Sequence, residues 1–258
     1  MPMIDVGDCR LNVSVEGNAD GPTLMLSNSL GTAMAMWEPQ MAAFGARFRV
    51  IRYDCRGHGQ SEFGETPYSV ERLGRDVVAI LDALDVEKTH WCGLSIGGMI
   101  GQWLGANASH RFDRLVLSNT SSYYPDPTNW DNRIRALSDG GYAAIADGVL
   151  NAWLTPGFRE REPGIVADMK AMLVATPPAG YIETCKALRT LDQRALLPGI
   201  PNPTLVIAGR EDPATPPAAG EFIATEIPGA QLVMLDAAHI SNVEQPGAFI
   251  QAVLDFLG

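Results

Sequence analysis

The stretch Gly93-Leu94-Ser95-Ile96-Gly97 decides how this chain is expected to fold and where its chemistry is expected to lie. The apolar run His90–Leu94 predicts a buried β-strand, and the segment Ile96–Ala108 predicts a helix. A serine between two glycines at a strand-to-helix junction is typical of a sharp turn that exposes a nucleophile. The glycines are required because side chains beside such a turn would collide with neighbouring backbone. We therefore expect Ser95 to lie at the carboxyl edge of a sheet, where open α/β sheets bind ligands.

Strand and helix patterns alternate on both sides of this junction. The further strand candidates are nearly continuous apolar runs, as expected for strands covered on both faces: Thr23–Ser27, Arg49–Asp54, Leu115–Asn119, Thr204–Ala208 and Leu232–Leu235. Val70–Leu84 and Gly247–Leu257 have helical patterns. Met3–Asp8 and Leu11–Gly17 predict an antiparallel hairpin at the sheet edge. The whole pattern predicts an α/β fold with a mostly parallel central sheet flanked by helices.

The alternation stops between about Ser122 and Leu191. This segment contains no clear strand pattern and predicts several helices, broken at Pro156, Pro163 and Pro177-Pro178. A chain of 258 residues fits one large domain that carries an insertion. We therefore interpret residues 122–191 as a helical cap inserted into a single core that comprises residues 1–121 and 192–258.

Composition and charge exclude several classes of function. The net charge of −11 and the pI of about 4.7 argue against binding to nucleic acid or to an anionic membrane. No stretch approaches the roughly 18 apolar residues that a membrane span requires, and the N-terminus lacks the pattern of a signal peptide. The four cysteines are scattered without metal-binding spacing, so we expect reduced thiols and a cytoplasmic location.

A serine nucleophile needs a general base, and the chain has four histidines. His90 begins a predicted strand and His110 follows a predicted helix, so we expect both to be structural. His239 follows the last predicted strand, where a loop returns to the sheet edge that carries Ser95. His58, in a tight loop after a strand, is the remaining alternative. We predict that His239 is the base.

A carboxylate must orient that imidazole and stabilise its cation. Asp212 directly follows a predicted strand, and the proline after it favours an extended conformation that suits a projecting side chain. Asp54 and Asp236 are the alternatives, although an aspartate at a strand end more often forms a turn. The position of Asp212 between Ser95 and His239 favours it, because α/β-hydrolases carry serine, acid and histidine in this order.

An oxyanion hole is expected beside the nucleophile. One donor should be the backbone N–H of Ile96, directly after the serine, and another should come from the loop after the first parallel strand. That loop is Asn28–Thr32, and the N–H of Leu30 is the candidate. A loop of small residues is also compatible with an ordinary turn.

Taken together, these residues resemble the α/β-hydrolase superfamily over essentially the whole chain. Tyr53–Ser61 (YDCRGHGQS) is similar to the D-x-R-G-x-G-x-S loop common in that superfamily, which implies a structural role for His58. One departure is that the oxyanion loop often begins His-Gly, whereas this chain has Asn28-Ser29. Only local bonding of the loop is affected, because the backbone donor does not depend on that side chain.

The chain resembles the 3-oxoadipate enol-lactonases of aromatic catabolism more closely. The similar stretches are Ser27–Thr32, Gly93–Met99, Ala175–Tyr181, Ala208–Pro216 and Ala238–Pro246, of which the cap stretch is more discriminating than the glycine-flanked serine. The resemblance implies cleavage of the ester bond of 3-oxoadipate enol-lactone to give 3-oxoadipate in the β-ketoadipate pathway. It also implies that no metal or organic cofactor takes part and that the partner is a small lactone or ester.

The substrate of that family carries a free carboxylate, which a protein of charge −11 repels overall. The cap contains seven Lys/Arg and eight Asp/Glu, so its net charge is only −1. We therefore predict that Arg133 binds the carboxylate, with Trp130 or Trp153 lining the pocket. Solvated helix charges and core aromatics are the alternative interpretation of these residues.

Several functions remain compatible with this sequence. A general carboxylesterase, another lactonase, a perhydrolase side activity or a hydrolase of carbon–carbon bonds would use the same Ser–Asp–His set. A non-catalytic α/β-hydrolase fold that binds a ligand is a further alternative. Neither the substrate nor the oligomeric state follows from the sequence.

Overall fold

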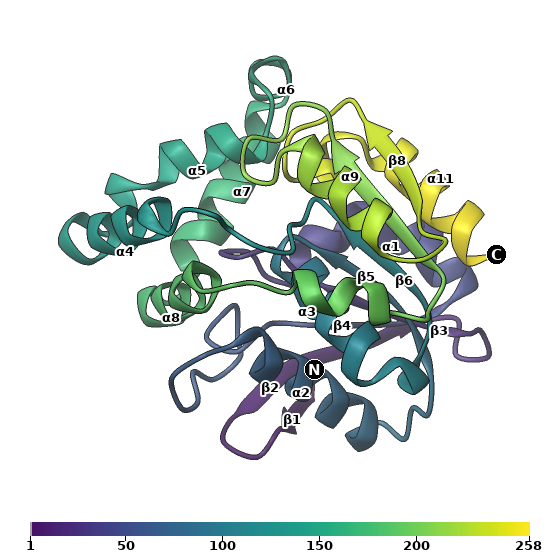
Figure 1. The fold of residues 1–258 in the computed structure, drawn as a ribbon. Coiled ribbons are helices and arrows are strands. Elements are labelled where there is room, and N and C mark those ends of the chain that lie inside the picture. Colours follow the sequence, from purple (N-terminus) through teal and green to yellow (C-terminus); the bar gives the residue numbers. More distant parts are fainter. Residues whose placement is uncertain (1) are drawn as a thin grey trace.

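The computed structural model describes residues 2–258, in which an eight-stranded sheet lies between two layers of helices (Figure 1). The strands are β1 (Met3–Asp5), β2 (Arg10–Gly17), β3 (Thr23–Ser27), β4 (Arg49–Tyr53), β5 (Thr89–Leu94), β6 (Phe112–Ser118), β7 (Thr204–Gly209) and β8 (Gln231–Leu235). Their order is β1-β2-β4-β3-β5-β6-β7-β8. Only the pairings of β1 with β2 and of β2 with β4 are antiparallel. The predicted fold class and the N-terminal hairpin are confirmed.

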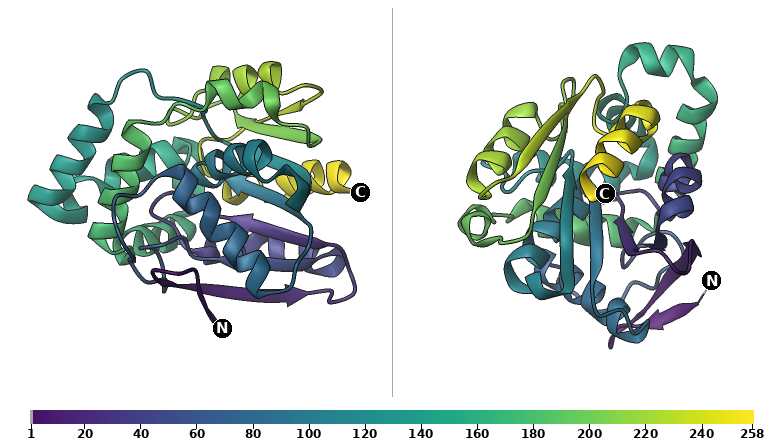
Figure 2. Two further views of the ribbon diagram at one scale, coloured as in Figure 1. Left: turned by 60° about the horizontal axis from the view of Figure 1, so that its bottom comes forward. Right: turned by 90° about the vertical axis from the view of Figure 1, so that its right-hand side faces the viewer.

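Helices cover both faces of the sheet. One layer contains α2 (Val70–Ala83), α3 (Ile96–Asn107) and α9 (Pro217–Glu226), and the other contains α1 (Glu38–Arg47) and α11 (Pro246–Leu257). The view along the sheet in Figure 2 separates these two layers. Short helices complete the core: α10 (Ser241–Glu244), η1 (Met34–Trp37), η2 (Ser109–Arg111) and η4 (Arg194–Gly199). Because strands such as β5 and β7 are buried along their whole length, they have continuous apolar runs in the sequence.

The segment between β6 and β7 is helical. It contains α4 (Thr128–Gly140), η3 (Gly141–Ala144), α5 (Ala146–Trp153), α6 (Pro156–Arg161), α7 (Pro163–Ala175) and α8 (Pro178–Arg189). These helices gather beyond one end of the sheet (Figure 1). An isolated β-bridge pairs Tyr123 with Asp192 at the base of the segment. Pro156, Pro163 and Pro178 each occupy the first helical position, where the missing N–H of proline costs nothing.

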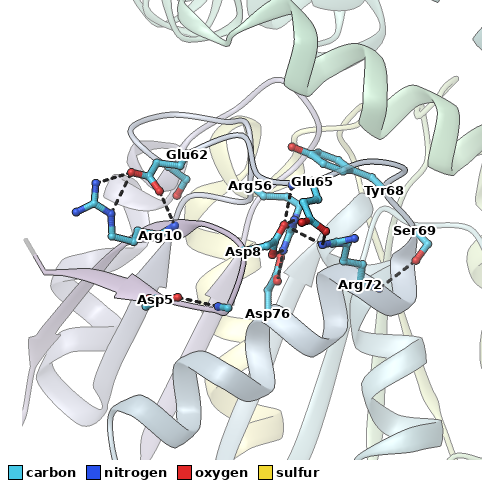
Figure 3. A network of polar contacts seen from close by, with 12 residues as sticks. Asp5, Asp8, Arg10, Arg56, Glu62, Glu65, Tyr68, Ser69, Arg72 and Asp76 are labelled. Atoms are coloured by element: carbon cyan, nitrogen blue, oxygen red, sulfur yellow. Dashed lines mark hydrogen bonds and ion pairs between the residues drawn. The ribbon is translucent and has the colours of Figure 1, made fainter.

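A buried ion-pair network connects the loop after β4 to α2 (Figure 3). The Arg56 guanidinium is 1% exposed and donates to both carboxylate oxygens of Asp76, at 2.7 and 2.6 Å. It also donates to Asp8, which accepts a further hydrogen bond of 2.8 Å from Arg72. The hydrogen bond from Arg56 lowers the pKa of Asp8 well below its usual value, although burial opposes this shift. The network therefore fixes the Tyr53–Ser61 loop against the core.

We predict that Asp76→Asn destabilises the protein by about 3 kcal/mol, because it replaces the buried carboxylate that pairs with the Arg56 guanidinium by a neutral amide and leaves only Asp8 as a charged partner. Urea unfolding followed by circular dichroism measures this change. Glu71→Gln, which removes an exposed pair with Arg75, is the matched control and should cost at most about 0.5 kcal/mol. Equal losses in the two variants would contradict the structural importance of the network.

Candidate active site

Ser95 lies in a strained turn between β5 and α3. Its φ of 60° and ψ of −114° lie in a region that non-glycine residues rarely adopt. Two hydrogen bonds stabilise this backbone: the Ser95 N–H donates to the Ser118 carbonyl at 2.8 Å, and the Thr120 hydroxyl donates to the Ser95 carbonyl at 2.8 Å. The end of the neighbouring strand β6 therefore keeps the serine in its strained conformation.

The two glycines beside this serine are sterically required. A Cβ atom at Gly93 would lie 2.1 Å from the Gly97 carbonyl oxygen. A Cβ atom at Gly97 would lie 2.4 Å from the carbonyl oxygen of Ser27 on β3. Both distances are far below van der Waals contact, so the turn can approach the sheet this closely only with glycine at both positions.

His239 and Asp212 are paired in the loops after β8 and β7. The His239 Nδ1 lies 2.9 Å from Asp212 Oδ2, and both side chains are buried. The other oxygen of Asp212 accepts the backbone N–H groups of Ala214 and Thr215 at 2.8 and 2.9 Å. The Thr215 hydroxyl and the Asn119 amide also donate to Asp212 Oδ2, at 2.7 and 3.1 Å. The carboxylate is thus oriented toward the imidazole by its donors.

The groups around Asp212 also determine its charge. Burial alone would raise the pKa of its carboxyl group. The charge and hydrogen bond of His239, together with the hydrogen bonds from Thr215, lower that pKa below its usual value. Asp212 is therefore ionised at neutral pH, as a group that stabilises an imidazolium must be.

A cavity of about 270 Å³ lies between the core and the cap. Its core side is lined by Ser29, Leu30, Ser95, Pro213, Ala214 and His239. Its cap side is lined by Tyr124, Asp126, Asn129, Trp130, Arg133, Val149, Ala152, Trp153 and Leu188. Among the hydrogen bonds of residues 2–258, none joins the Ser95 hydroxyl to the imidazole, although both groups face this cavity. Such contacts are often long before substrate binds.

The predicted oxyanion donors are buried and unpaired. Within residues 2–258, the backbone N–H groups of Leu30 and Ile96 donate to no protein acceptor. Leu30 is 5% exposed and Ile96 is 2% exposed, and Leu30 lines the cavity. Because buried N–H groups are rarely without a partner, these two are available to an oxygen that develops negative charge.

The alternative histidine and carboxylates lie elsewhere. His58 is buried with its Nδ1 3.1 Å from the Arg56 carbonyl oxygen, and it does not line the cavity. Asp54 accepts the Met34 and Gln60 N–H groups and so stabilises a turn. Asp236 is exposed and pairs with Arg210 at 2.9 Å. None of the three lines the cavity that Ser95 and His239 line.

The structure brings all three predicted cap residues to the cavity. The Arg133 guanidinium lies 5.2 Å from the centre of the Trp130 ring, and its Nη1 lies 3.5 Å from the Tyr181 hydroxyl. Arg133 forms no ion pair with any carboxylate in residues 2–258. Trp153 is 4% exposed and lies at the end of α5. The cavity is therefore lined by one half-buried cation, Arg133, and by the aromatic rings of Tyr124, Trp130 and Trp153.

Three residues of the site escaped the sequence analysis. Asn119, directly after β6, donates to both Asp212 and the Ala238 carbonyl, so it connects the Asp212 loop to the His239 loop. Thr215 contacts Asp212 from three residues along the chain. Tyr124 packs edge-on against Trp130 with ring centres 5.1 Å apart. A strand-end position was a usable signal for Asn119, whereas the other two contacts depend on loop conformation.

Comparison with known proteins agrees with this geometry. The family model for the alpha/beta hydrolase fold matches residues 22–160. The chain belongs to the α/β-hydrolase family. A second model, for TAP-like proteins, matches residues 178–257.

Similar proteins include hydrolases with different named substrates. 3-Oxoadipate enol-lactonase 2 of Acinetobacter baylyi is 42% identical over 95% of this chain and 92% of its own length. The crystal structure of the enol-lactonase from Burkholderia xenovorans LB400 is 42% identical, covers 99% of both chains and has a TM-score of 0.97. A protein named for carbamate hydrolysis, RutD of Agrobacterium fabrum, is 32% identical over 93% of this chain and 94% of its own length. The protein is therefore a hydrolase of this family.

Three further features of the described chain bear on what it could bind. Within residues 2–258, no group of three or more histidine, cysteine or carboxylate side chains is arranged to bind a metal ion. No helix in the same residues is both long and apolar enough to cross a membrane. All four cysteines are buried free thiols.

We predict that Asp212→Asn lowers kcat of this hydrolase by about 10³–10⁴-fold, because the amide neither orients the imidazole nor stabilises its cation. Hydrolysis of p-nitrophenyl acetate measures the change. Asp236→Asn is the matched control, since that exposed carboxylate lies outside the cavity, and it should retain the parent rate within about twofold. A variant at Asp212 that is as active as the one at Asp236 would show that another group serves as the acid.

Proposed function

We propose that this hydrolase cleaves the ester bond of 3-oxoadipate enol-lactone by a serine mechanism and releases 3-oxoadipate. The observation that carries the proposal is the unpaired Arg133 guanidinium, which faces the cavity that also contains Ser95 and His239. The substrate is a small lactone with one free carboxylate, and a single cation opposite a nucleophile suits such a molecule. The relatives named as enol-lactonases support the same choice.

Acylation would begin when the Ser95 hydroxyl attacks the lactone carbonyl and His239 takes its proton. Asp212 would stabilise the imidazolium, and the N–H groups of Leu30 and Ile96 would bind the oxyanion. Collapse of the tetrahedral intermediate breaks the ring C–O bond. The leaving oxygen takes the proton from the His239 imidazolium and becomes an enol. An enol is a better leaving group than an alkoxide, and it then tautomerises to the ketone.

Deacylation would use the same groups in reverse. His239 removes a proton from water, the resulting hydroxide attacks the acyl-serine, and the ester bond to Ser95 breaks. The Ser95 oxygen recovers its proton from the imidazolium, and the product leaves as a carboxylic acid that loses its proton to solvent to give the second carboxylate. No group other than the described side chains and water is needed to balance these steps.

The substrate is tested by comparing two esters and a carbamate on the purified protein. We expect kcat/KM for 3-oxoadipate enol-lactone to exceed that for p-nitrophenyl acetate by at least 100-fold, because only the lactone uses the Arg133 contact. A value no greater than that for the simple ester would refute the enol-lactonase proposal. Faster cleavage of a small carbamate than of the lactone would instead favour the activity for which RutD is named.

We predict that Arg133→Ala lowers kcat/KM for the enol-lactone by about 10–100-fold, which corresponds to losing one charge-assisted hydrogen bond of about 1.5–3 kcal/mol. Hydrolysis of neutral p-nitrophenyl acetate should change less than twofold. Arg135→Ala, at an exposed position of the same helix outside the cavity, is the matched control and should affect neither substrate. If Arg133→Ala leaves the lactone reaction unchanged, another group binds the carboxylate.

A further inference from the structure

Glu244, the last residue of α10, is a buried carboxylate between the histidine loop and the cap. It is 6% exposed, and its Oε2 accepts the Ala238 N–H at 2.9 Å. The same oxygen accepts the Thr155 N–H at 3.3 Å, and Oε1 accepts the Thr155 hydroxyl. Ala238 directly precedes His239, whereas Thr155, at the start of α6, lies 89 residues before Glu244. A single side chain therefore connects the loop of the predicted base to the cap.

A second hydrogen bond connects the other side of the same loop to the cap. The Ile240 N–H donates to the Trp153 carbonyl at 2.9 Å. Both chain neighbours of His239 are thus attached to the junction of α5 and α6, Ile240 directly and Ala238 through Glu244. Trp153 also lines the cavity, so the same junction carries a wall of the substrate site.

A carboxylate at position 244 suits this connection better than a neutral side chain would. Within residues 2–258, no Lys, Arg or His forms an ion pair with it, so its charge is balanced only by hydrogen-bond donors. A carboxylate is acceptor-only and can accept all three donors. A glutamine whose carbonyl stays on the two N–H groups would turn its NH₂ group toward the Thr155 hydroxyl, which already accepts the Phe158 N–H and would lose the acceptor for its own proton. Removing the carboxylate would leave buried donors of Ala238 and Thr155 unpaired.

We infer that Glu244 is a positioning residue. It keeps the His239 imidazole correctly placed relative to Asp212 and to Trp153, which lines the cap side of the cavity. The inference rests on the proposed serine mechanism, in which His239 must reach Ser95. A displacement of the imidazole by a fraction of an ångström lowers the rate of proton transfer without changing which groups are present. Glu244 touches no reacting atom in this mechanism and acts only through the loop.

The test measures the reactivity of Ser95 without relying on any natural substrate. The second-order rate constant for labelling by a fluorophosphonate is determined for the parent, Glu244→Gln, Thr155→Val and Thr155→Ser, together with kcat and KM for p-nitrophenyl acetate. We expect Glu244→Gln and Thr155→Val to reduce both the labelling rate and kcat about tenfold or more, with KM within about twofold of the parent. Thr155→Ser retains the hydroxyl and should stay within about twofold of the parent in every parameter.

Thermal unfolding separates positioning from stability. Labelling rates of Glu244→Gln and Thr155→Val within twofold of the parent, at a temperature where both are folded, would overturn the inference even if both melt earlier. Thr155→Ser as slow as Thr155→Val would also overturn it, since packing of the methyl group would then be responsible. If Glu244→Gln does not fold, Thr155→Val, at a half-buried position, carries the same test.

A further variant separates the contact with Glu244 from the role of Thr155 as a helix cap. Thr155 also accepts the Phe158 N–H at the start of α6, so Thr155→Asp is included because it keeps an N-cap acceptor while placing a carboxylate against Glu244. We expect it to be as slow as Thr155→Val, and parent-like labelling would show that only the helix cap matters.

Parent protein that labels no faster than Ser95→Ala would refute the serine mechanism itself. Normal labelling of the parent together with unchanged Glu244→Gln would refute the positioning role alone.

Discussion

The close approach of backbone at the Ser95 turn is the constraint on which the site depends. With no room for a Cβ atom at Gly93 or Gly97, the turn packs directly against β3 and against its own helix. This packing supports the strained backbone of Ser95 and directs its side chain to the carboxyl edge of the sheet. Since every parallel strand ends at that edge, the loops after β7 and β8 bring Asp212 and His239 to the same place.

Hydrogen bonds between loops then determine how these groups are oriented. Asn119 connects the acid loop to the histidine loop, and Thr215 fixes the carboxylate of Asp212 from within its own loop. Glu244 extends the connections from the histidine loop to the cap. The site is thus one continuous network in which the cap contacts the His239 loop as well as the cavity.

The charged side chains at the cavity differ from those of the protein as a whole. The protein carries a net charge of −11, yet the cavity contains an arginine without a carboxylate partner in the described chain. Arg133 lies beside the face of Trp130, which favours a cation without neutralising it. Asp126 lies at the same cavity, so the balance between one cation and one carboxylate there determines how strongly an anion is attracted.

The sequence by itself determined the fold class, the parallel strands, and the Ser–Asp–His candidates, because each depends on local pattern and chain order. Buried strands require continuous apolar runs, and the Ser95 turn requires its two glycines. α1 and α9 were not predicted, since both begin at proline or polar residues and have short apolar patterns. Only the tertiary structure decided which polar side chains meet: Asn119 with Asp212, Arg133 with the cavity, and Glu244 with Thr155. These contacts join residues far apart in the chain through loop conformations, and no local propensity or periodicity encodes such distances.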